Sequence, residues 1–584
     1  MNDKPRLIEV AFPLKQASIA SVHEKNVRHG HLSTLHIWPA RRPLAACRAA
    51  LLATLLPDPG DSEKRRELLA KIGGAVVTKS VEETDDEGNT VVEDKQVVEG
   101  GVLAWGHEDE ASMEALRKEI ASFYGDKAPS VLDPFAGGGA IPLEAMRLGC
   151  SATASDLNPV AWFILKCTLD YPQQLAGKTW PLPSFVRDWP DFLEDFLAGK
   201  VKKRRGDKKS HFSDPKQLAL MELPHADLAW HVRAWGRWVL ERARANLAAR
   251  YPIVNGEHTV AYLWARTARD KVSTGRIPLL KSFWLCRKKG RRVALLPIPS
   301  ADRLRVDFVL LRDADLDQPE RIIADNPYLS AWDVKAETLS DFLDLGTMNR
   351  AGVWSPLSGR PGMIALTTED LRRQGQQGLL GTQMISVVVE VVKAGAKKAV
   401  KFYRLPSESE LVAASPEIED VAATFKDLPF GIPNEATPAG GGSGASRAFS
   451  LHNYGLKKWR DIFTSRQLLA LGTFAIQTRQ AIQVIRQNED PASEALAAYL
   501  TILFGRLANY MSTLCIWDPT AGEVKQTFSR YALPVNWDFA EANPLSHSDR
   551  YYAGGMEVAA KAITSLLVAT KNNVQQPDIR RSSS

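Results

Sequence analysis

The feature that most restricts the fold of this 584-residue chain is the segment Asp133-Pro134-Phe135-Ala136-Gly137-Gly138-Gly139. A short apolar stretch, residues 130–132, precedes it, and residues 141–148 have the composition of a helix. Glycines lack a Cβ atom, so the backbone can turn sharply there and approach a ligand closely. The pattern therefore predicts a strand, a tight turn, and a helix whose N-terminal N–H groups face the turn.

A second acid stands roughly 20 residues further on, at the end of the next predicted strand, residues 151–155. In nucleotide-binding sheets an acid at this distance, here Asp156, accepts hydrogen bonds from ribose hydroxyls. Leu157 and Asn158-Pro159 would then flank an adenine ring. A dinucleotide fold is disfavoured, because Pro142 stands where G-x-G-x-x-G needs its last glycine. The pattern is typical of a methyltransferase pocket, with helix N–H groups for the carboxylate of S-adenosylmethionine and Asp133 for its ammonium group.

The chain resembles the adenine-specific DNA methylases that contain a zinc ribbon, a family found in phage-defence gene clusters. The most specific likeness is Arg28-His29-Gly30-His31-Leu32-Ser33-Thr34-Leu35-His36-Ile37-Trp38-Pro39-Ala40-Arg41-Arg42-Pro43-Leu44. It continues through the glycine segment and through residues 262–267, 463–469 and 535–541, so it covers most of the chain. The resemblance implies an α/β fold: an incomplete Rossmann-like class I methyltransferase core with a β-rich insertion and additional helical regions.

By the same likeness, His36, Trp38, Arg41 and Arg42 lie near the methionyl end of S-adenosylmethionine or near DNA. The alternative is that the two arginines only precede a helix, predicted here over residues 44–56. Cations are disfavoured at a helix N-terminus by its dipole. We therefore expect an anion beside these arginines.

Composition and pattern predict the organisation of the chain. Leu228, Val232, Trp235 and Val239 form one face of a long helix, as do Leu496, Leu500, Leu503 and Leu507. Beyond about Tyr262, short apolar β-type runs at residues 292–296, 306–310 and 386–392 are separated by turn residues. The expected segments are an N-terminal segment closing the cofactor site (1–60), a charged insertion with a hairpin and a helix (61–121), the cofactor-binding core (122–180), a helical region with a basic loop (181–260), a β-rich inserted domain (261–430), a linker (431–450) and a C-terminal helical region (451–584).

Composition sets further limits. The five cysteines are scattered, which is typical of a reducing compartment. No apolar run approaches the roughly 18 residues of a membrane helix. We expect a cytoplasmic protein with no membrane partner. A formal net charge of +6 permits DNA binding without requiring it.

The chain departs from the family where the family binds zinc. The ribbon's C-P-x-C position reads Ser355-Pro356-Leu357-Ser358, and the other knuckle, near Arg269 to Ile277, contains no cysteine. Structural zinc needs four thiolate or imidazole ligands. We therefore expect no metal and a β-rich insertion held by packing alone.

A second departure concerns catalysis. Related enzymes orient the target amine with Asp/Asn-Pro-Pro-Tyr/Phe, and no such tetrapeptide occurs here. Asp325-Asn326-Pro327-Tyr328 lacks the second proline, so the catalytic residues stay unassigned. In the family the tetrapeptide follows the helical region, at a position just beyond the last residue of this sequence. The sequence is therefore interpreted as a fragment, as a subunit completed by a separate catalytic chain, or as a homologue that has lost activity.

Two basic clusters, residues 202–209 and 287–292, suit DNA phosphates, and Phe283 and Trp284 beside the second could stack on bases. The leading hypothesis is the cofactor-binding portion of an S-adenosylmethionine-dependent DNA adenine-N6 methyltransferase in anti-phage defence. DNA and other defence proteins are its expected partners. The alternative is a catalytically silent DNA- or cofactor-binding subunit of a defence complex.

Overall fold

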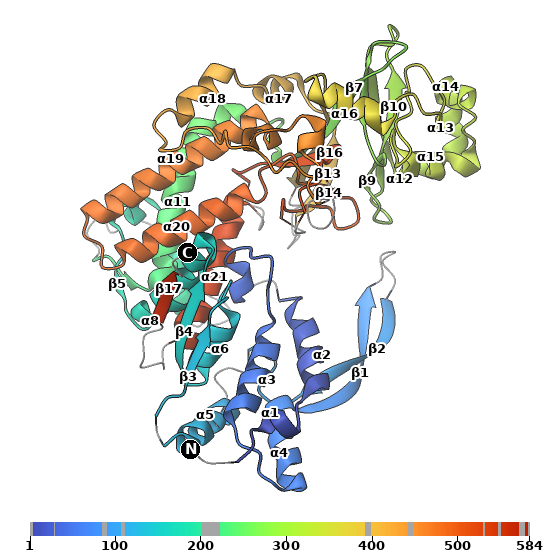
Figure 1. Cartoon of the computed structure of the whole chain (residues 1–584). Coiled ribbons are helices and arrows are strands. Elements are labelled where there is room, and N and C mark those ends of the chain that lie inside the picture. The colour runs from blue at the N-terminus through green and yellow to red at the C-terminus, as the bar shows by residue number, and fades with distance from the viewer. Residues whose placement is uncertain are drawn as a thin grey trace.

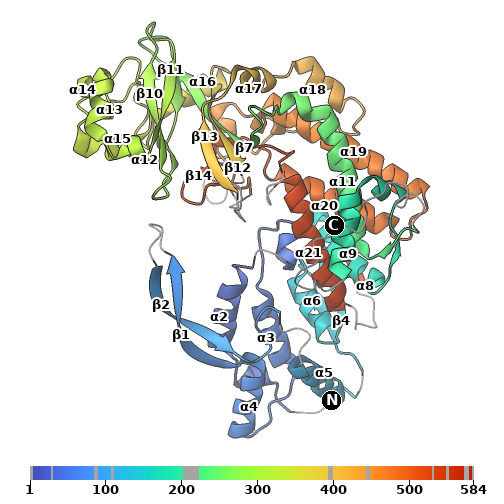
Figure 2. The same cartoon turned by 180° about the vertical axis from the view of Figure 1, so that it is seen from behind.

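The computed structural model describes residues 4–27, 30–84, 90–106, 111–125, 127–200, 222–391, 399–441, 448–528, 532–546, 551–570 and 578–581. The two ends of the molecule differ in secondary structure (Figure 1). N-terminal helices and the hairpin β1–β2 occupy one end, and a β-rich unit occupies the other. Long helices and a small parallel sheet lie between them, and the view from behind shows the same order (Figure 2).

The parallel sheet has the strand order β17-β4-β3. Its strands are β3 (Ser130–Asp133), β4 (Ser151–Asp156) and β17 (Asp578–Arg581), and β4 pairs in parallel with both neighbours. Helix α6 (Ala140–Arg147) connects β3 to β4, as predicted from the sequence. Parallel neighbours end at the same edge of a sheet. Asp133 and Asp156 therefore lie close together at that edge.

The N-terminal segment packs on this sheet unit through a buried ion pair. Arg48 on α3 (Leu44–Leu55) donates to Glu144 on α6, with Nε–Oε2 2.5 Å and Nη2–Oε1 3.0 Å. Arg147 donates to the same carboxylate, and both side chains of the Arg48–Glu144 pair are at most 1% exposed. Burial alone would raise the pKa of Glu144, but Arg48 and Arg147 hold it below its ordinary value. The pair fixes the loop between η1 (Leu32–Thr34) and α3 relative to the glycine turn.

Further elements of this half precede the sheet or follow it in the chain. The first group is α1 (Leu7–Val10), α2 (Leu14–Glu24), η1 (Leu32–Thr34), α4 (Ser62–Gly73), the antiparallel hairpin β1 (Ala75–Thr84) and β2 (Thr90–Glu99), and α5 (Ala111–Phe123). The second group is α7 (Pro159–Leu165), η2 (Lys166–Asp170), α8 (Tyr171–Leu175), β5 (Trp180–Pro181), η3 (Ser184–Asp188), α9 (Pro190–Lys200) and β6 (His225–Ala226). The hairpin expected within the charged insertion 61–121 is present as β1 and β2, and residues 85–89 between the two strands lie outside the described residues.

Four long helices form the middle of the molecule (Figure 1). They are α11 (Leu228–Leu247), α19 (Ser465–Gln487), α20 (Ser493–Ala508) and α21 (Tyr552–Thr570). Both apolar stripes predicted from the sequence are buried core faces of α11 and α20. None of the described helices is long and apolar enough to cross a membrane.

The β-rich unit contains a five-stranded sheet. Its strands β13 (Val400–Arg404), β12 (Gly381–Val391), β7 (His258–Arg269) and β16 are neighbours in that order, and β8 (Arg276–Leu279) also pairs with β7. Strand β16 (Asp538–Ala542) comes from the segment expected to be helical, so the 261–430 unit does not complete its own sheet. The other elements are η4 (Ala248–Arg250), β7 (His258–Arg269), β8 (Arg276–Leu279), β9 (Trp284–Cys286), β10 (Val293–Pro299), β11 (Val306–Arg312), α12 (Asp313–Leu316), α13 (Pro319–Asp325), α14 (Pro327–Ala331), η5 (Ala336–Thr338), α15 (Leu339–Leu345), α16 (Thr368–Gln376), β12 (Gly381–Val391), β13 (Val400–Arg404), α17 (Glu408–Ala413), α18 (Ile418–Phe425), η7 (His452–Tyr454), η8 (Trp459–Ile462), β14 (Trp517–Asp518) and β15 (Glu523–Val524).

Candidate functional site

The glycine turn and the second acid are in direct contact. The Gly137 N–H donates to Asp156 Oδ2 at 2.9 Å, and the Ala136 N–H donates to the Ser155 carbonyl at 3.0 Å. Asp156 Oδ1 accepts from the Asn158 N–H at 2.8 Å. Each carboxylate oxygen has two lone pairs, so Asp156 can accept further bonds from a ligand hydroxyl.

The N-terminal loop covers the glycine turn. Gly137 has φ +53°, and a Cβ atom there would lie 2.5 Å from Trp38 Nε1. The indole therefore occupies the space that the missing side chain leaves. Gly139 has φ +87° and faces the interior instead, where a Cβ atom would meet Thr168 and Leu165.

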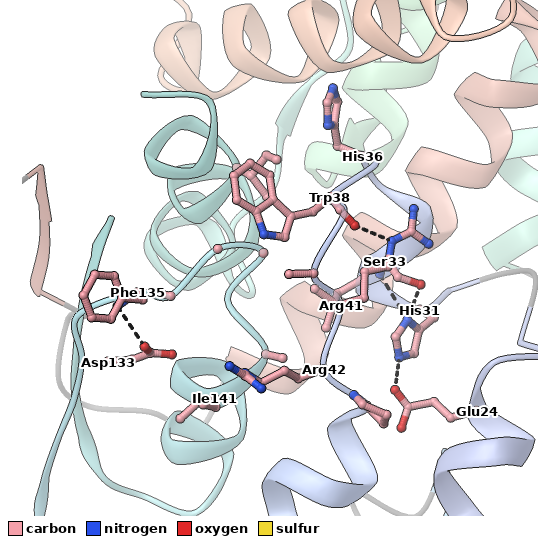
Figure 3. Close-up of a pocket in the computed structure, with 18 of the residues that line it drawn as sticks. Glu24, His31, Ser33, His36, Trp38, Arg41, Arg42, Asp133, Phe135 and Ile141 are labelled. Atoms are coloured by element: carbon pink, nitrogen blue, oxygen red, sulfur yellow. Dashed lines mark hydrogen bonds and ion pairs between the residues drawn. The ribbon is translucent and has the colours of Figure 1, made fainter. Parts of the chain in front are cut away.

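A pocket of about 480 Å³ opens between this loop and the carboxyl ends of β3 and β4 (Figure 3). Pockets of this size suit small-molecule cofactors. Nine of the residues predicted to bind the cofactor line it: His36, Trp38, Arg41, Asp133, Phe135, Ala136, Gly137, Gly138 and Asp156. Burial raises the pKa of Asp133 against the opposing effects of the Phe135 N–H and Arg42.

Five predicted cofactor residues are not among the lining residues. Pro134 and Gly139 belong to the turn, and Leu157 is 61% exposed. Asn158 caps α7, because its Oδ1 accepts from the Val160 N–H at 2.9 Å, and Pro159 is the first residue of that helix. The expectation that residues 157–159 flank an adenine ring thus has no support from the pocket lining.

Arg41 and Arg42 are exposed cations on the pocket wall, as Figure 3 shows. Arg41 Nε donates to the Trp38 carbonyl at 3.2 Å. Within the described part of the chain no carboxylate forms an ion pair with either arginine. Burial lowers the pKa of nearby His36, and Arg506 and Arg41 add to this effect. This wall suits an anionic ligand group.

A side-chain carboxylate lies at the N-terminus of α3, the helix that Arg41 and Arg42 precede. Glu24 caps α3, because its carboxylate accepts from the Leu44 N–H at 2.8 Å and the Ala45 N–H at 2.9 Å. The helix dipole stabilises this buried carboxylate.

Glu24 also belongs to a chain of hydrogen bonds that sequence reasoning missed. Glu24 Oε1 lies 2.7 Å from His31 Nε2, and His31 Nδ1 lies 2.7 Å from Ser33 Oγ (Figure 3). The Ser33 N–H also donates to Nδ1, so Nδ1 carries no proton in the neutral ring and the Ser33 hydroxyl is the donor. All three residues line the pocket, and these hydrogen bonds fix the orientation of the His31 ring there.

The three other segments of the family likeness meet in a separate buried network. Glu541 accepts from Arg466 Nε at 2.8 Å and from Trp264 Nε1 at 3.0 Å. Arg466 and Glu541 are fully buried, and the Arg466 guanidinium stacks on Tyr262. These residues join α19 to β7 and β16, which is a structural role.

Several residues predicted to contact nucleic acid are buried or form ion pairs within the protein. Phe283 is fully buried, so the prediction that it stacks on bases is wrong. Arg287 pairs with Asp344, and Arg292 pairs with Asp313 and Asp317. The basic cluster 202–209 and residues Arg28 and His29 lie outside the described residues.

Comparison with known proteins gives one finding. Residues 11–72 match the model of a family described as "Protein of unknown function (DUF1156)". The matched region includes the loop with His36, Trp38 and Arg41. No curated protein and no solved structure matches the chain.

Proposed function

We propose that this chain is the cofactor-binding portion of an S-adenosylmethionine-dependent DNA adenine-N6 methyltransferase of an anti-phage defence system. The observation that carries the proposal is the contact between Gly137 and Asp156, at the adjacent ends of two parallel strands and beside a pocket of about 480 Å³. A Rossmann-like core places its ligand at this edge of the sheet. The proposal therefore includes that fold class.

The pocket offers a group for each part of the cofactor. Asp156 suits the ribose hydroxyls, Asp133 suits the ammonium group, and the N-terminus of α6 with Arg41 suits the carboxylate. The cofactor would supply an electrophilic methyl group. The residues of this chain would bind and orient it, and Trp38 would limit access of water from the N-terminal side.

A partner polypeptide supplies the catalytic tetrapeptide in this proposal. Among the described residues β3 has a neighbour on one edge only. Leu132, Phe135, Leu157 and Val160 are exposed by 66%, 82%, 61% and 48% around this sheet. An open edge with exposed apolar side chains favours a further strand-bearing chain.

Two measurements test the proposal. Calorimetry with S-adenosylmethionine should show one binding site per chain. Transfer of labelled methyl groups to adenine in DNA should appear only when the product of an adjacent gene carrying a Pro-Pro-Tyr-type tetrapeptide is added. Cofactor binding without methylation in any mixture would favour the silent subunit. Absence of cofactor binding would contradict the proposed function and would leave only a silent DNA-binding subunit.

A further inference from the structure

Two neighbouring turns in the β-rich unit carry polar side chains three residues apart. Asp270 and Ser273 lie in the turn between β7 and β8, which is closed by the Asp270 N–H and the Gly275 carbonyl at 2.8 Å. Ser355 and Ser358 lie in a second turn, in which the Gly359 N–H donates to the Ser355 carbonyl at 2.9 Å. Asp270 is 3% exposed and Ser355 is fully buried.

The three serine hydroxyls converge on one carboxylate oxygen of Asp270. Asp270 Oδ2 accepts hydrogen bonds from Ser358 Oγ at 2.5 Å, Ser355 Oγ at 2.8 Å and Ser273 Oγ at 2.9 Å. Asp270 Oδ1 accepts from the Val272 N–H at 3.2 Å. The buried carboxylate is therefore well provided with donors, as a buried charge must be.

Side-chain pairs with a C-x-x-C spacing on two adjacent turns are also the arrangement of a structural zinc site, which the family resemblance implies for this unit. The residues present do not fit zinc. Three of the four are serines, whereas such sites use thiolates and imidazoles. Among the residues that the structure describes, no group of three or more His, Cys, Asp or Glu could hold a metal ion.

We infer that the Asp270 carboxylate takes the structural place of a zinc ion, binding Ser273, Ser355 and Ser358 and so locking the two turns together without metal. The insertion is thus not held by packing alone. A fully hydrogen-bonded buried network fixes one arrangement of its parts. This role is separate from that of the cofactor pocket and holds whether or not the chain binds S-adenosylmethionine.

Acid, and not a metal chelator, should therefore break the hydrogen bonds of Asp270 that join the two turns. Burial by itself would raise the pKa of Asp270, but the bonds from Ser358, Ser355, Val272 and Ser273 hold it below its ordinary value. A depressed carboxyl pKa contributes stability above the unfolded-state pKa, and this contribution is lost as pH falls through the folded-state pKa.

The test uses the full chain with Asp270→Asn and Asp270→Ala. The matched control is Asp302→Ala, because Asp302 also accepts from a serine, Ser300 Oγ at 2.6 Å, but at the surface. Both Asp270 variants should lower Tm by about 4–8 °C, and the control by about 1 °C or less. Wild-type protein should contain no stoichiometric zinc and keep its Tm in EDTA. Zinc at one atom per chain, loss of Tm in EDTA, or an unchanged Tm in Asp270→Asn would overturn the inference.

A gain of function provides a second test that does not depend on destabilisation. If the four positions surround one point, the variant D270C/S273C/S355C/S358C should bind one zinc per chain and should lose Tm in EDTA. A folded four-cysteine variant that takes up no zinc would show that the positions do not form a common centre. Ser355→Ala and Ser358→Ala each remove one hydrogen bond and should give smaller, graded losses of Tm.

Discussion

At the scale of single residues, Gly137 is constrained both by its backbone conformation and by a neighbouring side chain. Its φ is positive, and the indole of Trp38 lies where a Cβ atom would be. Gly137→Ala therefore adds a steric clash to backbone strain and should destabilise the protein by about 2–4 kcal/mol. Thermal unfolding measures this loss.

Gly256→Ala is the matched control. Gly256 has φ +72° with nothing within 4 Å of its missing Cβ atom, so this variant carries only the backbone strain, about 1 kcal/mol. Adding Trp38→Ala to Gly137→Ala should recover part of the stability. Equal losses for the two glycine variants would show that Trp38 does not lie against Gly137.

Arg41 and Arg42 are candidates for contact with either the cofactor or DNA. A salt titration distinguishes these two alternatives. If they contact phosphates, DNA affinity of the R41A/R42A variant should be weaker and its slope against log salt should fall by about 2. If they contact the cofactor carboxylate, S-adenosylmethionine affinity should fall and the DNA slope should stay the same. Arg321→Ala, at an exposed site on α13 outside both basic clusters, is the control.

Local sequence pattern was sufficient to predict the strand, turn and helix around Gly137, because neighbouring residues determine them. It could not predict the contact of Trp38 with Gly137, which brings together residues about a hundred positions apart. The hydrogen bonds of His31 with Glu24 and Ser33 were also missed. Their only signal was a histidine two residues before a serine, a pattern too common to interpret alone.

At the scale of elements, the Arg48–Glu144 ion pair between α3 and α6 places the N-terminal loop over the pocket. Arg48→Ala leaves a buried carboxylate with Arg147 as its remaining ion-pair partner and should cost about 3–5 kcal/mol of stability. Thermal unfolding and cofactor affinity should both decline. Arg305→Ala, which breaks an exposed pair with Asp307, should change neither. A loss of stability as small as that of the control would contradict the assigned role of the pair.

The β-rich unit shows why element type is easier to predict than element partnership. Strands β10, β11 and β12 fall where the apolar runs predicted them. Strand β16, in contrast, pairs with β7 although more than 250 residues of chain separate the two strands. The residues of β7 that lie opposite β16 are aliphatic or aromatic, so they carry no signal that identifies β16 as the neighbour. Alternation along a strand reports which face is buried and says nothing about which strand is adjacent.

At the scale of the whole molecule, DNA binding should be electrostatic. Raising salt from about 50 to about 200 mM should weaken DNA affinity by at least about tenfold if several phosphates are contacted. Fluorescence anisotropy with a labelled duplex measures this change. A DNA affinity that does not change over this salt range would count against DNA as a partner.

Calorimetry of S-adenosylmethionine binding to wild-type protein and to Asp156→Ala tests the central claim most directly. Asp61→Ala is the control, because Asp61 also accepts backbone N–H bonds but caps α4 away from the pocket. We predict that the Asp156 variant loses about 1–3 kcal/mol of binding free energy, on the order of 5- to 150-fold in Kd, and that the control keeps the wild-type Kd. Equal affinity in a folded Asp156→Ala protein, or no binding by the wild type, would contradict the account.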